Sequence, residues 1–215
     1  MAHFRPMTRC HIQVKNPAGA ARAFTLIEML VVIAIIGILA ALTVGVLPGI
    51  SEKRTRSRVR AEMVAIETAI NTYKEKQGFY PPDNPADVTQ APLFYELTGT
   101  DFAPGVPAFY TNILGGVVDS VTITNNLGVG GFLNCAQPGS SEARQNYFPT
   151  LKPSAYADMP STPAVKLLVV PIQGTNGTFN PWRYNSSRPT HNADSYDLWV
   201  DVVLGGKTIT IGNWK

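Results

Sequence analysis

An almost uninterrupted apolar segment near the N-terminus constrains this chain of 215 residues more than any other feature. Between residues 24 and 50, 20 of the 27 residues are apolar and Glu28 is the only charged one. Because a helix rises about 1.5 Å per residue, about 20 residues cross the ~30 Å hydrocarbon core of a bilayer. The sequence therefore predicts one transmembrane helix over residues 24–50. This segment is longer than the apolar core of a secretory signal peptide, which is roughly 7–15 residues.

Charge is distributed unevenly around this segment. Residues 1–23 hold four basic residues and no acid, and residues 53–60 hold five more basic residues. Beyond residue 60 there are 9 basic and 13 acidic residues, which argues against a nucleic-acid-binding head. The cluster at 53–60 has three interpretations: it binds anionic lipid headgroups, it pairs with acidic faces of neighbouring subunits, or it is a solvated helix face.

A second helix is predicted after Pro48 and Gly49, which we expect to kink or loosen the chain. It runs from about residue 51 to residue 77 and ends before Gly78, a residue suited to helix C-termini. Apolar residues recur at spacings of 3 and 4, which places them on one helix face that packs on a globular head. These residues are Val59, Met63, Ile66, Ile70 and Tyr73.

The junction Arg22-Ala23-Phe24-Thr25-Leu26-Ile27-Glu28 resembles the processing site of type IV prepilins and type II secretion pseudopilins. The resemblance covers residues 18–50 and joins a basic leader, a hexapeptide and an apolar helix. It implies that a prepilin peptidase cuts between Ala23 and Phe24 and methylates the new amino group of Phe24. Ala23 stands where that family usually has glycine. The leader begins at Met1 or at Met7.

Glu28 has a role under this resemblance. Placing a carboxylate of an apolar helix at the centre of a bilayer costs about 2.5–3.5 kcal/mol, and less near the surface. A carboxylate at such a position therefore usually pairs with a partner group. The implied partner is the amino group of Phe24 in a neighbouring subunit, and this pair sets the axial register of a filament. The alternative is that Glu28 lies at the membrane surface, where its carboxylate contacts water and has no role in assembly.

The remainder, residues 79–215, is predicted to be a loop-rich head with β-strands. Strands are expected at residues 117–124, 165–172, 182–184, 196–204 and 207–211, with long loops over residues 125–159. Gly205-Gly206 predicts a two-residue hairpin turn. The residues around Trp182, Trp199 and Trp214 are similar to the C-terminal domain of the major type II secretion pseudopilin. The fold class is therefore α+β and pilin-like, with a long N-terminal helix packed on a small C-terminal antiparallel sheet.

No cofactor is expected, and calcium is the weak alternative. Major pseudopilins hold calcium with a long acidic loop, which a tight turn replaces here. Asp194, Asp197 and Asp201 remain as candidate oxygen ligands, but calcium takes six to eight oxygens and these three do not converge along an extended segment. A Ser-His-Asp triad of Ser187 or Ser195 with His191 and Asp194 is also expected to be incidental, so an enzyme is not predicted.

The resemblance implies a subunit of a type II secretion pseudopilus for protein export, built from residues 1–23 as leader, 24–50 as membrane and assembly helix, 51–78 as amphipathic helix and 79–215 as head. It implies a bacterial inner-membrane protein with a cytoplasmic N-terminus and a periplasmic head. The implied partners are further copies, other pseudopilins, prepilin peptidase, the assembly platform and lipid, but no nucleic acid. The alternatives are a type IV pilin for adhesion, motility or DNA uptake, and a membrane-tethered enzyme or binding module with an uncleaved anchor.

Overall fold

The computed structural model describes residues 24–44, 47–140, 143–175, 177 and 179–214, with only the backbone for residues 42–44 and 47–50. The described chain forms two compact units, one ending at Leu47 and one beginning at Pro48. The elements in chain order are α1 (Leu26–Val44), α2 (Leu47–Gln77), α3 (Leu93–Thr98), β1 (Thr100–Ala103), β2 (Phe109–Asn112), β3 (Val117–Asp119), α4 (Ser120–Leu127), β4 (Cys135–Ala136), a 3-10 helix η1 (Pro153–Ala155), β5 (Tyr156–Met159), β6 (Thr162–Leu168), β7 (Arg183–Asn185), β8 (Asp197–Leu204) and β9 (Lys207–Gly212). The predicted α+β class is confirmed.

The apolar segment falls on α1 and on the first turn of α2, and residues 45–46 lie outside the described residues. Pro48 is the second residue of α2, a position where proline is tolerated because its missing N–H would have no partner within the helix. Among the described residues, no helix combines the length and the apolarity needed to cross a membrane.

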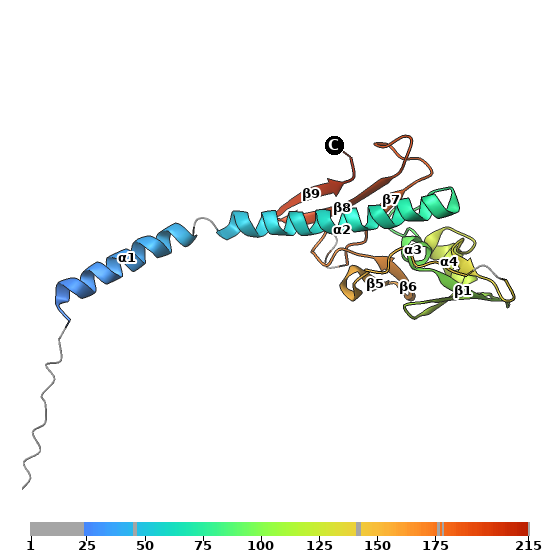
Figure 1. The fold of residues 1–215 in the computed structure, drawn as a ribbon, viewed down its shortest axis with the longest axis horizontal. Helices are drawn as coiled ribbons and strands as arrows, with labels where there is room; N and C mark the ends of the chain where they lie inside the picture. The colour runs from blue at the N-terminus through green and yellow to red at the C-terminus, as the bar shows by residue number, and fades with distance from the viewer. Residues whose placement is uncertain (1–23, 45–46, 141–142, 176, 178, 215) are drawn as a thin grey trace, which may run out of the picture. The chain divides into compact units, whose positions relative to one another are not determined.

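The amphipathic helix is confirmed. All five residues of the predicted stripe are buried, and Val59, Ile70 and Tyr73 are completely inaccessible. The helix ends at Gln77, and Gly78 follows with φ +86° and donates its N–H to the carbonyl of Lys74. Figure 1 shows β8 and β9 running along α2, with β1, β5 and β6 on the other side of the helix near its C-terminal half.

Three small sheets cover the helix. The first is mixed, in the order β3-β2-β1-β4, the second pairs β5 with β6, and the third is antiparallel in the order β7-β8-β9. The predicted C-terminal sheet is thus confirmed. Buried residues of β8 alternate with half-buried ones, as expected for a strand with one face in the core. Its core residues are Leu198, Val200, Val202 and Leu204.

The predicted strand over residues 117–124 is wrong in its second half, which is the helix α4. The carboxylate of Asp119 accepts hydrogen bonds from the N–H groups of Val121 and Thr122, each 3.0 Å away, and caps the helix. Gly128 ends it with a left-handed backbone. This capping outweighs the strand preference of the β-branched residues, which is weak by comparison. The strand expected at 165–172 begins earlier and ends at Leu168.

A buried carboxylate joins three segments of the head. Glu96 on α3 is fully buried and accepts hydrogen bonds from the hydroxyl of Tyr73 at 3.0 Å and from the N–H groups of Leu133 at 2.9 Å and Asn134 at 3.0 Å. Burial raises the pKa of Glu96, because the charged form is poorly solvated there, while these hydrogen bonds oppose the rise. The contact fixes α3 against α2.

The β8–β9 turn supports a first prediction. Gly205 and Gly206 have φ +56° and +77°, and a Cβ on Gly205 would lie 2.3 Å from Oε1 of Glu52. Gly205→Ala should therefore lower the free energy of unfolding by about 1–2 kcal/mol, the cost of a left-handed residue with a side chain. Chemical denaturation of the full chain in detergent measures this. Gly130→Ala is the control, since its Cβ meets nothing within 4 Å, and equal losses in both variants would contradict the prediction.

Candidate functional site

The start of α1 is the first candidate site. The hydroxyl and the backbone N–H of Thr25 donate to Oε2 of Glu28 at 2.9 and 3.0 Å, and the N–H of Glu28 donates to the hydroxyl of Thr25 at 3.3 Å. This reciprocal pair is a capping box, which satisfies N–H groups that have no partner within the helix. The sequence analysis missed it, although Thr-x-x-Glu before an apolar run is its usual signature. Ala23 lies outside the described residues.

The surface of α1 is apolar on every side. All its described side chains are exposed in the single chain, among them Leu26, Ile27, Ile33 and Ile38, each between 62% and 83% exposed. A surface of this kind is rarely left in contact with water and marks contact with lipid or protein. Helices of this composition associate by close packing rather than by charge.

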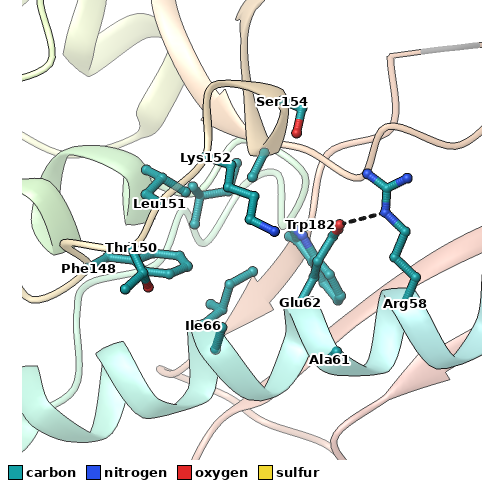
Figure 2. Close-up of a pocket in the computed structure, with 13 residues that line it drawn as sticks. Arg58, Ala61, Glu62, Ile66, Phe148, Thr150, Leu151, Lys152, Ser154 and Trp182 are labelled. Carbon is teal, nitrogen blue, oxygen red and sulfur yellow. Dashed lines mark hydrogen bonds and ion pairs between the residues drawn. The ribbon is translucent and has the colours of Figure 1, made fainter.

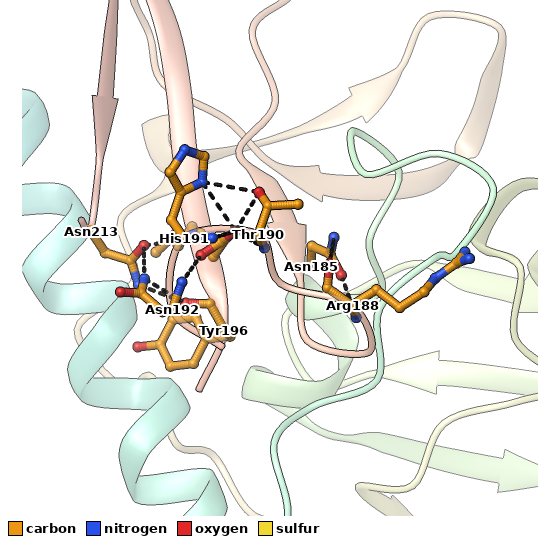
Figure 3. Close-up of polar contacts among 9 residues, drawn as sticks. Asn185, Arg188, Thr190, His191, Asn192, Tyr196 and Asn213 are labelled. Atoms are coloured by element: carbon orange, nitrogen blue, oxygen red, sulfur yellow. Dashed lines mark hydrogen bonds and ion pairs between the residues drawn. The ribbon is translucent and has the colours of Figure 1, made fainter. Parts of the chain in front are cut away.

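The C-terminal loop between β7 and β8 is held by two carboxylates. Oδ2 of Asp83 accepts from the N–H groups of Ser186 and Ser187, both at 3.0 Å, and from the hydroxyl of Ser187 at 2.8 Å. Asp197, which is 1% exposed, accepts from three consecutive N–H groups: Thr190 at 2.7 Å, His191 at 2.9 Å and Asn192 at 2.9 Å (Figure 3). Sequence analysis did not identify either role.

Burial raises the pKa of Asp197, but the three N–H groups and the ring of His191 stabilise the carboxylate and lower its pKa overall. Both oxygens are therefore occupied by donors. Asp201 has different partners, with one oxygen 3.3 Å from the guanidinium of Arg183 and the other accepting from the hydroxyl of Thr210. Asp194 is exposed. The structure does not bring the three calcium candidates together, and no metal-ligand cluster occurs among the described residues.

The serines and the histidine of the candidate triad have other partners. The hydroxyl of Ser187 donates to Asp83, and that of Ser195 lies 3.1 Å from the hydroxyl of Tyr80. The ring of His191 stacks on Trp214, with 3.8 Å between the ring centres. Burial raises the pKa of the Cys135 thiol, which disfavours the reactive thiolate. In the described part of the chain, these groups form no nucleophile–base pair.

A groove of about 270 Å³ lies between α2 and residues 148–155 (Figure 2). Its walls are largely apolar, with Ile66 and Trp182 buried. Arg58 Nε pairs with Oε1 of Glu62 at 3.2 Å, whereas the buried Oε2 of Glu62 has no hydrogen-bond partner among the described residues. The residues that line the groove include no histidine or cysteine.

Comparison with known proteins agrees with the geometry at α1. Residues 19–44 match the prokaryotic N-terminal methylation motif. The chain is 47% identical over 60 residues to type II secretion system core protein G of Klebsiella pneumoniae, which covers 28% of this chain and 43% of that protein. It is 44% identical over 63 residues to the same protein of Escherichia coli K12, covering 29% of this chain and 43% of that protein.

A third similarity reaches further along the chain. The type IV major pilin protein PilE1 of Neisseria gonorrhoeae is 32% identical over 109 residues, which covers 49% of this chain and 41% of that protein. The chain thus spans less than half the length of the curated relatives it matches. No solved structure matches it significantly. The resemblance to prepilin-type proteins is confirmed, and the methylation motif lies in the N-terminal part of the chain.

Proposed function

We propose that this chain is a prepilin-like subunit of a type II secretion pseudopilus that serves protein export. The observation that carries the proposal is α1, a helix exposed and apolar on all sides that begins within a methylation motif. The similarity to core protein G of two enterobacteria supports secretion as the process. In this proposal α1 anchors the subunit in the bacterial inner membrane until it enters the filament, and the head lies outside the cytoplasm.

Assembly needs no chemistry from the subunit itself. Prepilin peptidase removes residues 1–23 and methylates the amino group of Phe24, and an assembly platform in the inner membrane delivers the subunit. Apolar packing between α1 helices supplies the driving force. Glu28 pairs with the charged amino terminus of a neighbouring copy and so sets the register. The subunit is a structural component and not an enzyme.

A type IV pilin is the second candidate, because the similarity to PilE1 extends over more of the chain than the similarity to core protein G. Deleting the gene distinguishes the two functions. Loss of exported proteins without loss of a surface pilus supports the secretion subunit. Loss of a pilus seen by electron microscopy, with normal export, supports the pilin.

The processing step gives a direct prediction. Mass spectrometry of the protein purified from its own membranes should find Phe24 as the first residue, carrying one added methyl group. The matched control is a strain without the prepilin peptidase, in which the leader should remain. An N-terminus at Met1 or Met7 in the wild-type strain would contradict the proposal and favour an uncleaved anchor.

A further inference from the structure

The N-terminal half of α2 exposes four cations that have no counter-charge. Lys53, Arg54, Arg56 and Arg60 are exposed and make no ion pair with any described residue. Arg58 differs, because it pairs with Glu62. Lys53, Arg56 and Arg60 follow one another at spacings of 3 and 4 and therefore share a helix face, where like charges repel. An anion against this face would relieve that repulsion.

Glu52, the acid next to these cations in the sequence, lies against the β8–β9 turn. Oε1 of Glu52 would lie 2.3 Å from a Cβ on Gly205, so its carboxylate rests against the β8–β9 turn. The same turn brings Lys207, which is exposed, to this end of the head. In Figure 1 the turn end of the β8–β9 hairpin lies beside the N-terminal half of α2. We call Lys53, Arg54, Arg56, Arg60 and Lys207 the cationic band.

We infer that the cationic band binds the phosphate groups of anionic lipid headgroups. The inference rests on the membrane anchorage proposed above. Nine positions separate Val44 from Lys53, so the chain can extend at most about 30 Å between them, and less because α2 has begun. This short connection lets the start of α2 reach the bilayer surface. Cations that come within a Debye length of about 8 Å of anionic headgroups are attracted to them.

Six acids of the head are already engaged within their own subunit. Asp101 pairs with Arg144, Asp158 with Lys166, and Asp201 with Arg183 within the same subunit. Asp83, Glu96 and Asp197 are buried and accept internal hydrogen bonds. Much of the negative charge on a second copy is therefore already neutralised or enclosed. A lipid surface, whose phosphates are free, is the better complement.

The test uses the full chain in detergent micelles that contain either phosphatidylglycerol or phosphatidylcholine, with native mass spectrometry to count retained lipids. The wild-type chain should retain phosphatidylglycerol at least tenfold more strongly, and high salt should reduce the preference. Removing Arg56 and Arg60 together (Arg56→Gln, Arg60→Gln) should weaken retention roughly fivefold per cation. The matched control is Lys76→Gln with Arg188→Gln, which removes the same charge from exposed sites elsewhere and should change nothing.

Two outcomes would overturn the inference. The first is equal retention of both lipids by the wild-type chain. The second is an unchanged lipid preference in the Arg56/Arg60 variant together with weaker cross-linking between subunits, which would assign the band to a neighbouring copy. Failure of the anchorage proposal is separately visible, because the chain would then leave isolated membranes on washing with alkaline carbonate.

Discussion

Glu28→Gln is expected to leave the start of α1 intact and to abolish filament assembly. Glutamine retains an acceptor oxygen and is the accepted alternative to glutamate in a capping box, so the hydrogen bonds with Thr25 persist. The negative charge is lost, and with it the attraction to the amino group of Phe24 in a neighbouring subunit. Membrane fractionation should show normal insertion, and cross-linking or electron microscopy should show few or no filaments.

Thr25→Ala is the matched control, because it removes the cap and keeps the charge. Loss of such a cap costs about 1 kcal/mol, which frays the first turn of the helix but leaves Glu28 able to pair. We expect filaments in reduced number. If Glu28→Gln assembles normally and Thr25→Ala does not, then Glu28 acts only as a cap within its own helix, and the register role is wrong.

The elements that sequence analysis predicted well are those with a strong local pattern. The stripe on α2 repeats over five positions, and burial of all five in the head follows from helical geometry alone. The hairpin turn at Gly205-Gly206 could likewise be predicted, because two adjacent glycines readily adopt the positive φ angles that the turn requires. The helical character of residues 26–44 follows from the unbroken apolar run that contains no proline.

Sequence analysis was wrong about residues 120–124 and did not foresee the hydrogen bonds of Asp197. Residues 120–124 have the composition of a strand, and only the hydrogen bonds of Asp119 make them a helix. Asp197 was a candidate metal ligand because aspartates bind calcium, whereas its oxygens accept N–H groups from a loop that folds back over it. The contacts of Asp119 are local and have the usual spacing of a helix N-cap, so they could have been predicted. The contacts of Asp197 require the loop to fold back on β8, which spacing along the chain does not reveal.

Asp197→Asn should lower the free energy of unfolding by about 3 kcal/mol. The amide group would place a donor against the N–H groups of residues 190–192, and buried donors without an acceptor cost about 1–3 kcal/mol each. The side chain of Asn192, which donates to Asn213 Oδ1 at 3.1 Å, should lose its position as the loop detaches. Chemical denaturation measures the loss, and the control is Asp194→Asn on the exposed part of the same loop, which should be nearly neutral.

The pH dependence distinguishes this role from simple packing. The pKa of Asp197 is lowered in the folded chain, so its contribution is complete above the unfolded value of about 3.9. The contribution is lost as the pH falls from there through the lower folded value. The difference in stability between wild type and Asp197→Asn should therefore be constant from pH 7 to pH 5 and shrink below pH 4. A constant difference in stability at every pH would contradict the carboxylate role. If added calcium stabilised the wild-type chain but not Asp197→Asn, Asp197 would be a calcium ligand instead.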